Sequence, residues 1–211
     1  MKHAPCPRET SHPVETGHTA HVEDAVSALA DAFDGYAWTS WTVPAHDHAQ
    51  RLRGLFRVTI SEVGLPFGEV WVSRCPATRD VVGAAVALRP DREVPDEVWH
   101  RVAPVEEALM GDRLPAAQAA EAACRPLRPS EPHLVLATIG VRRDHQRRGV
   151  ASALLHEVVS LADSLGVPTY LETSSAANLA LYARAGFSVL DAVSVPNGGP
   201  PVWGMTRHRF V

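Results

Sequence analysis

The stretch that decides the fold runs from Leu134 to Ser152 and reads LVLATIGVRRDHQRRGVAS. Its first part, Leu134–Val141, is an apolar run of strand length. Arg142–Arg148 is cationic and turn-like, and from Gly149 onward apolar residues recur every three or four positions, as they do along one face of a helix. The sequence therefore predicts a strand, a basic loop and a helix, in that order.

The start of this helix is suited to a phosphate group. The free backbone N–H groups and the dipole at a helix N-terminus favour negative charge. Gly149 has no side chain and Ala151 has a small one, so a ligand could approach the backbone closely. Neither GxxxxGK[ST] nor GxGxxG is present, which excludes the two best-known phosphate loops. Asp144-His145 has no accompanying nucleophile motif and is expected at the loop surface.

The hexapeptide Gln146–Ala151, QRRGVA, fits the pattern Q/R-x-x-G-x-G/A. In this pattern the chain resembles the GNAT superfamily of N-acetyltransferases, in which it is the acetyl-CoA signature. The resemblance implies acetyl-CoA as cosubstrate and no metal. We expect the cosubstrate to be bound by the strand end, the loop, the helix start and one downstream asparagine, namely Thr138, Ile139, Gly140, Val141, Gln146, Arg147, Arg148, Gly149, Val150, Ala151, Ser152 and Asn178.

A second signature, N-x-x-x-Y-x-R/K-x-G-F, matches Asn178–Phe187. By resemblance, Tyr182 faces the sulfur of CoA and acts as general acid. The chemistry agrees, because tyrosine (pKa about 10) and a thiol (about 8.5) are donors of comparable acidity. Backbone N–H groups of Thr138–Val141 are expected to stabilise the oxyanion. Glu172 is the candidate base, acting through water; alternatively it faces outward or holds a loop.

Further segments resemble a branch of the family that acetylates aminoacyl-nucleoside antibiotics. They extend over about residues 14 to 209 and include Ala32–Tyr36, Leu171–Ser174 and Trp203–Arg207. This resemblance implies that Tyr36 and Glu172 lie at the acceptor amine. Ala87 and Leu88 stand where the branch has a tryptophan, at a strand end expected to face the acceptor, so both are assigned to substrate binding.

Three aromatic residues, Tyr36, Trp38 and Trp41, gather in a segment predicted to be a loop between two helices, in a chain that is 6% aromatic. A loop with flat apolar side chains suits a lid over a small planar acceptor. The alternative is that Trp38 and Trp41 anchor the loop to the core. The two interpretations predict different effects of replacing the tryptophans, on acceptor binding or on stability.

The expected fold class is α+β, with a GNAT-type mixed, mostly antiparallel sheet around the central strand, loop and helix. Residues 1–13 are expected to form a mobile tail and residues 14–211 a single N-acetyltransferase domain. Periodicity and turn residues predict helices over 24–33, 50–63, 97–110, 115–123, 149–165 and 176–185, and strands over 14–18, 69–73, 81–88, 134–141, 169–173, 187–195 and 203–208.

The composition limits the classes of partner that the protein is expected to bind. The chain has 211 residues and a net charge of −4, without the basic character expected of a nucleic-acid-binding protein. No apolar run approaches the roughly 20 residues that span a membrane. Three cysteines without a CxxC pair indicate reduced thiols and a cytoplasmic protein. The expected partner is a small-molecule amine acceptor, and the expected state is a monomer or homodimer.

Two other functions remain open. The same fold could acetylate protein N-termini or lysines, although no acidic peptide channel is visible in the sequence. A non-catalytic acyl-CoA sensor is the other alternative, and the presence of Tyr182 argues against it.

Overall fold

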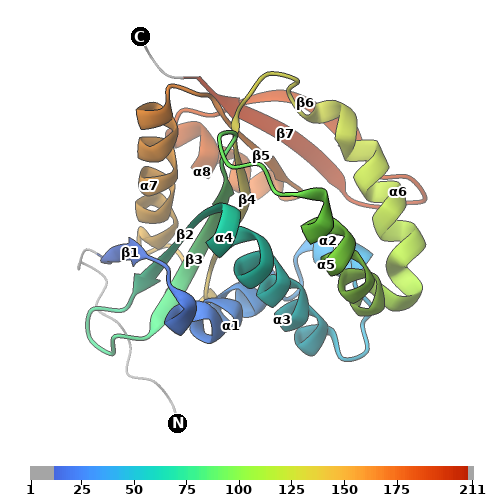
Figure 1. Ribbon diagram of the computed structural model, residues 1–211, viewed down its shortest axis with the longest axis horizontal. Helices are drawn as coiled ribbons and strands as arrows, with labels where there is room; N and C mark the ends of the chain where they lie inside the picture. The colour runs from blue at the N-terminus through green and yellow to red at the C-terminus, as the bar shows by residue number, and fades with distance from the viewer. Residues whose placement is uncertain (1–11, 209–211) are drawn as a thin grey trace.

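The computed structural model describes residues 12–208, in which one seven-stranded mixed sheet is flanked by helices (Figure 1). The strand order is β1-β2-β3-β4-β5-β7-β6, and every neighbouring pair is antiparallel except β4 and β5. The strands are β1 Val14–Thr16, β2 Gly68–Arg74, β3 Val81–Leu88, β4 Leu134–Val141, β5 Thr169–Thr173, β6 Ser188–Ser194 and β7 Pro201–Arg207. The expected α+β fold class is confirmed.

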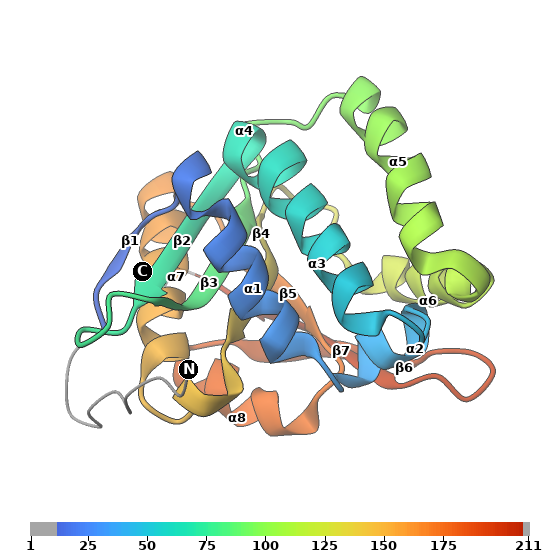
Figure 2. The same cartoon turned by 90° about the horizontal axis from the view of Figure 1, so that it is seen from below.

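Helices cover both faces of this sheet. The main helices are α1 Val22–Phe33, α2 Ala37–Thr42, α3 His48–Val58, α5 Asp96–Met110, α6 Leu114–Cys124, α7 Val150–Leu165 and α8 Ala176–Arg184. Helix α7 lies on one face of the sheet, and α1 and α3 lie on the other (Figure 2). Leu154 and Val158 of α7 belong to the apolar cluster on the first face, and Leu29 of α1 and Leu52 of α3 to the cluster on the second. Between residues 12 and 208 no helix combines the length and the apolar character needed to cross a membrane.

The central strand β4 contains a bulge. Val86 of β3 pairs with Thr138 whereas the next residue pairs with Leu136, so Ala137 is the extra residue. A bulge of one residue reverses the alternation of side chains between the two faces. Leu136 and Ile139 therefore both pack against the α7 side, although an unbroken strand would place them on opposite faces.

Strands β4 and β5 separate soon after they meet. They pair at Leu134↔Thr169 and Val135↔Tyr170, and the printed register ends there. The connection through α7 gives the parallel crossover that the sequence predicted. Beyond Val135, the β4 edge that faces β5 has no strand partner among residues 12–208, so its backbone donors and acceptors are available to a ligand of extended shape.

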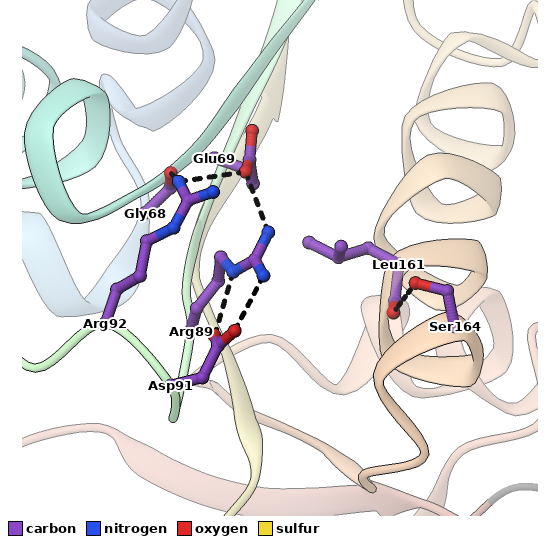
Figure 3. Close-up of polar contacts among 7 residues, drawn as sticks. All are labelled: Gly68, Glu69, Arg89, Asp91, Arg92, Leu161 and Ser164. Atoms are coloured by element: carbon purple, nitrogen blue, oxygen red, sulfur yellow. Dashed lines mark hydrogen bonds and ion pairs between the residues drawn. The ribbon is translucent and has the colours of Figure 1, made fainter.

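A long excursion joins β3 to β4. Antiparallel neighbours are usually connected by about two to five residues, but here α5 and α6 lie between Leu88 and Leu134. Ion pairs hold the residues that directly follow β3. Arg89 pairs with Glu69 and Asp91, and Arg92 pairs with Glu69 (Figure 3). Two helices are therefore inserted at the side of the sheet where β4 and β5 separate.

Two sequence expectations are corrected. The segment predicted to be an aromatic loop is the helix α2, in which the hydroxyl groups of Thr39 and Thr42 bond to backbone carbonyls. The helix predicted over 50–63 is divided into three parts. Helix α3 ends at Val58, a π-helix covers Thr59–Gly64, and the short α4 follows at Leu65–Phe67. In each case packing against the rest of the molecule outweighs weak local propensity.

The predicted tail is only partly covered by the structure, because residues 1–11 lie outside the described part of the chain. The structure describes only the last two residues of that segment, His12 and Pro13, so the mobile tail stays a prediction. The His12 side chain is buried, and the Pro13 carbonyl accepts a hydrogen bond from the Arg74 N–H at 3.1 Å, beside β2. Contacts with β2 therefore include residues that precede β1.

Candidate active site

A cavity of about 840 Å³ lies where β4 and β5 separate. Residues of α1, α2, β4, β5, α7 and α8 line it, together with two residues from the β3–β4 excursion. It has three parts: a backbone-rich end at the start of α7, a middle section along β4 with Tyr182, and an end with aromatic and charged side chains. The three parts meet in one volume, although their residues are far apart in the sequence.

The first part is the N-terminus of α7. The first intrahelical bond runs from the Ala153 N–H to the Gly149 carbonyl, and no side chain caps the helix. The amides of Val150, Ala151 and Ser152 are thus free to donate toward the cavity, which these residues line. Gly149 adopts φ +83°, and a Cβ placed on it would meet no atom within 4 Å. The open, donor-rich helix start fits a phosphate group.

The loop before α7 is tied to β4. The Gln146 side chain donates from Nε2 to the Val141 carbonyl at 3.2 Å. The Arg143 N–H donates to the Asp31 carboxylate of α1 at 2.7 Å. Arg147, at φ +60°, lines the cavity, whereas Arg148 does not. One of the two arginines assigned to the cosubstrate is therefore beside the phosphate end, and the other lies outside the cavity lining.

Strand β4 supplies the middle of the cavity. All four residues of Thr138–Val141 line it, and so does Ala137, the extra residue of the bulge. The Thr138 Oγ1 atom is buried and has no hydrogen-bond partner among the described residues. A ligand lying along this strand would find both unpaired backbone groups and an unpaired hydroxyl group.

Tyr182 of α8 is the ionisable side chain most deeply placed in this middle section. It is 5% exposed, lines the cavity, and packs edge-on against Phe187 with the ring centroids 6.0 Å apart. Burial, followed by the proximity of Tyr36, raises the pKa of its hydroxyl group well above the usual value. The phenol therefore stays protonated at neutral pH and is a donor rather than a base.

The Tyr36 hydroxyl group joins α2 to the end of β5. It accepts a hydrogen bond from the Ser174 N–H at 2.7 Å and lies 3.0 Å from Thr173 Oγ1. The backbone N–H of Trp38 donates to Ser174 Oγ at 3.1 Å. The start of α2 is thereby held beside the cavity, which Tyr36 and Trp38 both line.

Glu172 of β5 lies in a charged network at the same end. Its Oε1 atom accepts hydrogen bonds from Arg128 Nε at 3.0 Å and from the Tyr170 hydroxyl group at 3.1 Å. Burial, and next the charge of Glu172, raises the pKa of Tyr170 strongly. Burial also raises the pKa of the Cys124 thiol to about 12, so this thiol is protonated and not a nucleophile at neutral pH.

Three residues assigned to the acceptor do not line the cavity. Trp41 packs on the apolar cluster that includes Cys124 and Val195, and its carbonyl accepts a bond from Arg113 Nε at 2.7 Å. Ala87 is fully buried in the core beneath α7. Leu88 packs on an apolar cluster formed by α3, the π-helix and α5, and the buried members of this cluster are Val58, Val63, Val98 and Val102. The remaining assigned residues, apart from Arg148, are brought together.

Several cavity residues carried no sequence signal. Glu121 and Arg128 come from an alanine-rich region without a motif, and only the folding of the excursion brings them to Glu172. His145, expected at the surface, is buried at the cavity wall and bonds to Asp144 at 2.7 Å. Its position beside the hexapeptide that was predicted to bind phosphate was the available clue.

Comparisons with known proteins agree with this architecture. The profile of the acetyltransferase (GNAT) family matches residues 32–187. A crystal structure described as histone acetyltransferase HPA2 and related acetyltransferase, from Corynebacterium glutamicum ATCC 13032, is 24% identical over 96% of this chain and 98% of that one, with a TM-score of 0.73. The polyamine N-acetyltransferase of Drosophila melanogaster is 17% identical over 94% of this chain and 100% of that one, with a TM-score of 0.54.

An agmatine N-acetyltransferase is 18% identical, with 93% of this chain and 99% of that one covered and a TM-score of 0.59. At these identities the solved structures show a common fold, whereas the family profile extends over most of the chain. Members of this family use acetyl-CoA. The protein belongs to the acetyltransferase (GNAT) family and is an N-acetyltransferase.

Proposed function

We propose that the protein transfers the acetyl group of acetyl-CoA to a primary amine of a small molecule in the cytoplasm. The proposed acceptor class is an aminoacyl-nucleoside antibiotic such as puromycin, or a related translation inhibitor, so that acetylation would confer resistance. The observation that carries the proposal is the Tyr182 hydroxyl group, buried in the cavity between the phosphate-binding helix start and the aromatic end.

The residues present fit acetyl-CoA. The amides of Val150–Ser152 would hold the pyrophosphate, with Arg147 beside it. The unpaired edge of β4 would bond to the extended pantetheine arm, and the unpaired Thr138 hydroxyl group lies on the same path. Acetyl-CoA supplies the activated acetyl thioester. Amides along Thr138–Val141 would stabilise the negative charge that develops on the carbonyl oxygen during attack.

Tyr182 is the proposed general acid. Its raised pKa keeps the proton on the phenol until the sulfur departs. The same loss of solvation makes a departing thiolate more basic, as the raised pKa of the buried Cys124 illustrates within this fold. Donor and acceptor therefore shift in the same direction, and proton transfer from Tyr182 to sulfur stays feasible.

Glu172 is proposed to receive the acceptor amine and its proton. Its Oε1 atom is occupied by Arg128 and Tyr170, while Oε2 accepts no hydrogen bond from the residues between 12 and 208. Oε2 is therefore available to an ammonium group or to a water that relays the proton. Because an α-amino group has a pKa of about 7.7–8.0, a sizeable fraction is already neutral near pH 7.5. The carboxylate then needs to contribute only a modest factor.

The acceptor end favours a small molecule with an aromatic group. Phe33, Tyr36 and Trp38 line it and offer flat apolar surface. The chain also resembles puromycin N-acetyltransferase in segments spread over residues 14 to 209. Amine acetyltransferases recur among the structural neighbours. One is described as an agmatine N-acetyltransferase, one as a polyamine N-acetyltransferase and one as arylalkylamine N-acetyltransferase like 5b. These likenesses support amine acetylation and leave the specific acceptor as a proposal.

A coupled assay tests the proposal. Release of CoA from acetyl-CoA is measured with a panel that contains puromycin, aryl-alkylamines, polyamines and a lysine peptide. Tyr182→Phe should lower kcat by roughly 10²–10⁴-fold and leave the KM for acetyl-CoA nearly unchanged, since it removes a proton donor and keeps the ring packed on Phe187. Activity within a few-fold of wild type would show that Tyr182 has only a packing role.

A further inference from the structure

Two residues of the β3–β4 excursion enter the acceptor end of the cavity. Glu121 projects from α6, and Arg128 follows the helical turn Arg125–Leu127 that comes after it. The excursion is far longer than the pairing of β3 with β4 requires. This excursion contributes two charged side chains to the cavity.

Arg128 joins two carboxylates. Its Nη1 and Nη2 atoms donate to Glu121 Oε1 and Oε2 at 2.7 and 3.1 Å, and its Nε atom donates to Glu172 Oε1 at 3.0 Å. A fork-to-fork pair of this kind fixes orientation as well as distance. Without the guanidinium group, two carboxylates at one cavity wall would repel each other and separate.

The outer ion pair of this network adds little stability. The Arg128 and Glu121 side chains are 41% and 44% exposed, and ion pairs as open as this contribute little to folding, whereas the Glu172 side chain is 22% exposed. The charges instead define the cavity wall. Two carboxylates and one guanidinium group leave one net negative charge. The Nε, Nη1 and Nη2 atoms of Arg128 each donate a hydrogen bond to a carboxylate oxygen. An incoming ammonium group is attracted there, whereas an incoming carboxylate finds its cation occupied.

We propose that the β3–β4 excursion is the acceptor-specificity element of this enzyme, with Arg128 as a positioning residue that holds Glu121 and Glu172 side by side. The anionic wall selects amine acceptors in which no carboxylate stands beside the amine, such as amides, esters and decarboxylated amines, and disfavours free amino acids. The inference rests on the proposed function and specifies the chemical class of its acceptor.

The test measures binding without turnover. Tyrosinamide and tyrosine are nearly isosteric and differ by one negative charge. Their dissociation constants are measured by calorimetry on protein saturated with CoA. Wild type should bind tyrosinamide about tenfold more tightly than tyrosine, the ratio equivalent to one modest charge contact. Glu121→Gln should reduce this ratio, because it removes a negative charge and releases the outer face of Arg128.

Arg128→Met should change the ratio in the opposite direction, since it removes the positive charge of the wall. A merely structural role would not produce opposite shifts from the two variants. The matched control is Glu23→Gln, which breaks an exposed fork pair with Arg57 outside the cavity lining and should leave the ratio unchanged. Melting temperatures confirm that each variant is folded.

An equal affinity of wild type for the two probes would overturn the inference, and so would a ratio that Glu121→Gln leaves unchanged. Failure of the proposed function looks different. If CoA is not released from acetyl-CoA with tyrosinamide while the calorimetric preference and its opposite shifts persist, acetyl transfer to this class is wrong and the recognition role of the excursion stands.

Discussion

Replacing Gly149 with leucine separates the two roles of this residue, backbone conformation and ligand access. Gly149 and Gly166 stand at the two ends of α7, with φ of +83° and +69°, and a Cβ on either would meet no atom within 4 Å. The two positions therefore share the same left-handed strain and the same absence of clashes. They differ in that Gly149 lines the cavity and Gly166 does not.

The magnitudes follow from that comparison. A non-glycine residue in the left-handed region costs about 1–2 kcal/mol. For a chain of this size, each kcal/mol lowers the melting temperature by about 2–4 °C. Both Gly149→Leu and Gly166→Leu should show this loss. Only Gly149→Leu should also lose affinity for CoA, because its side chain occupies the space before the free amides of α7. Each charge-assisted hydrogen bond that is lost costs about 1.5–3 kcal/mol, equivalent to tenfold or more in affinity.

Calorimetric titration with CoA and thermal denaturation of the two variants give the answer. Equal CoA affinity in Gly149→Leu and wild type would place the phosphate site elsewhere. A similar loss of affinity in Gly166→Leu would mean that strain in α7, rather than direct obstruction, controls binding. The first result would refute the assignment of the helix start, and the second would refute direct obstruction as the cause of the lost affinity.

Two further predictions concern α2 and α6. Trp38→Ala and Trp41→Ala should both lower the melting temperature, because both side chains pack on the same apolar cluster, but only Trp38→Ala should raise the acceptor KM, since only Trp38 lines the cavity; equal KM values for the two variants would contradict this. Burial raises the pKa of Cys124 from 9.0 to about 12, so the unfolded chain ionises first and stability should fall as pH rises above about 9. Cys124→Ala should flatten that decline in urea-unfolding measurements, and an unchanged slope would remove Cys124 from its causes.

Patterns among neighbouring residues predicted many of the secondary-structure elements of the fold. The apolar run of β4, the basic loop and the amphipathic α7 were predicted from residues adjacent in the chain, and the structure confirms each of them. Gly149 was predicted to leave the helix start open to a ligand, and it adopts φ +83° with no atom within 4 Å of an added Cβ among the residues that the structure describes. Tyr182 was also identified by a short pattern, and the structure places it in the same cavity as the predicted phosphate site. Its catalytic role stays a prediction.

Ala87 and Leu88 show where sequence reasoning stopped. Side chains on a strand alternate, so the face that a residue occupies depends on register. On β3, Ala85 and Ala87 face the core beneath α7, and Val86 faces the side of α1. Which face is covered by α7 is set by the packing of separate elements, and no local pattern shows it.

The acceptor end required tertiary structure for the same reason. Tyr36 meets Thr173 across 137 positions of sequence, and Arg128 meets Glu172 across 44. The sequence determined the elements and the cosubstrate signature, because hydrophobic period, caps and turn residues act over a few neighbouring positions. Only the tertiary structure decided that α2 is helical and that the excursion contributes Glu121 and Arg128, since those outcomes depend on which distant surfaces pack together.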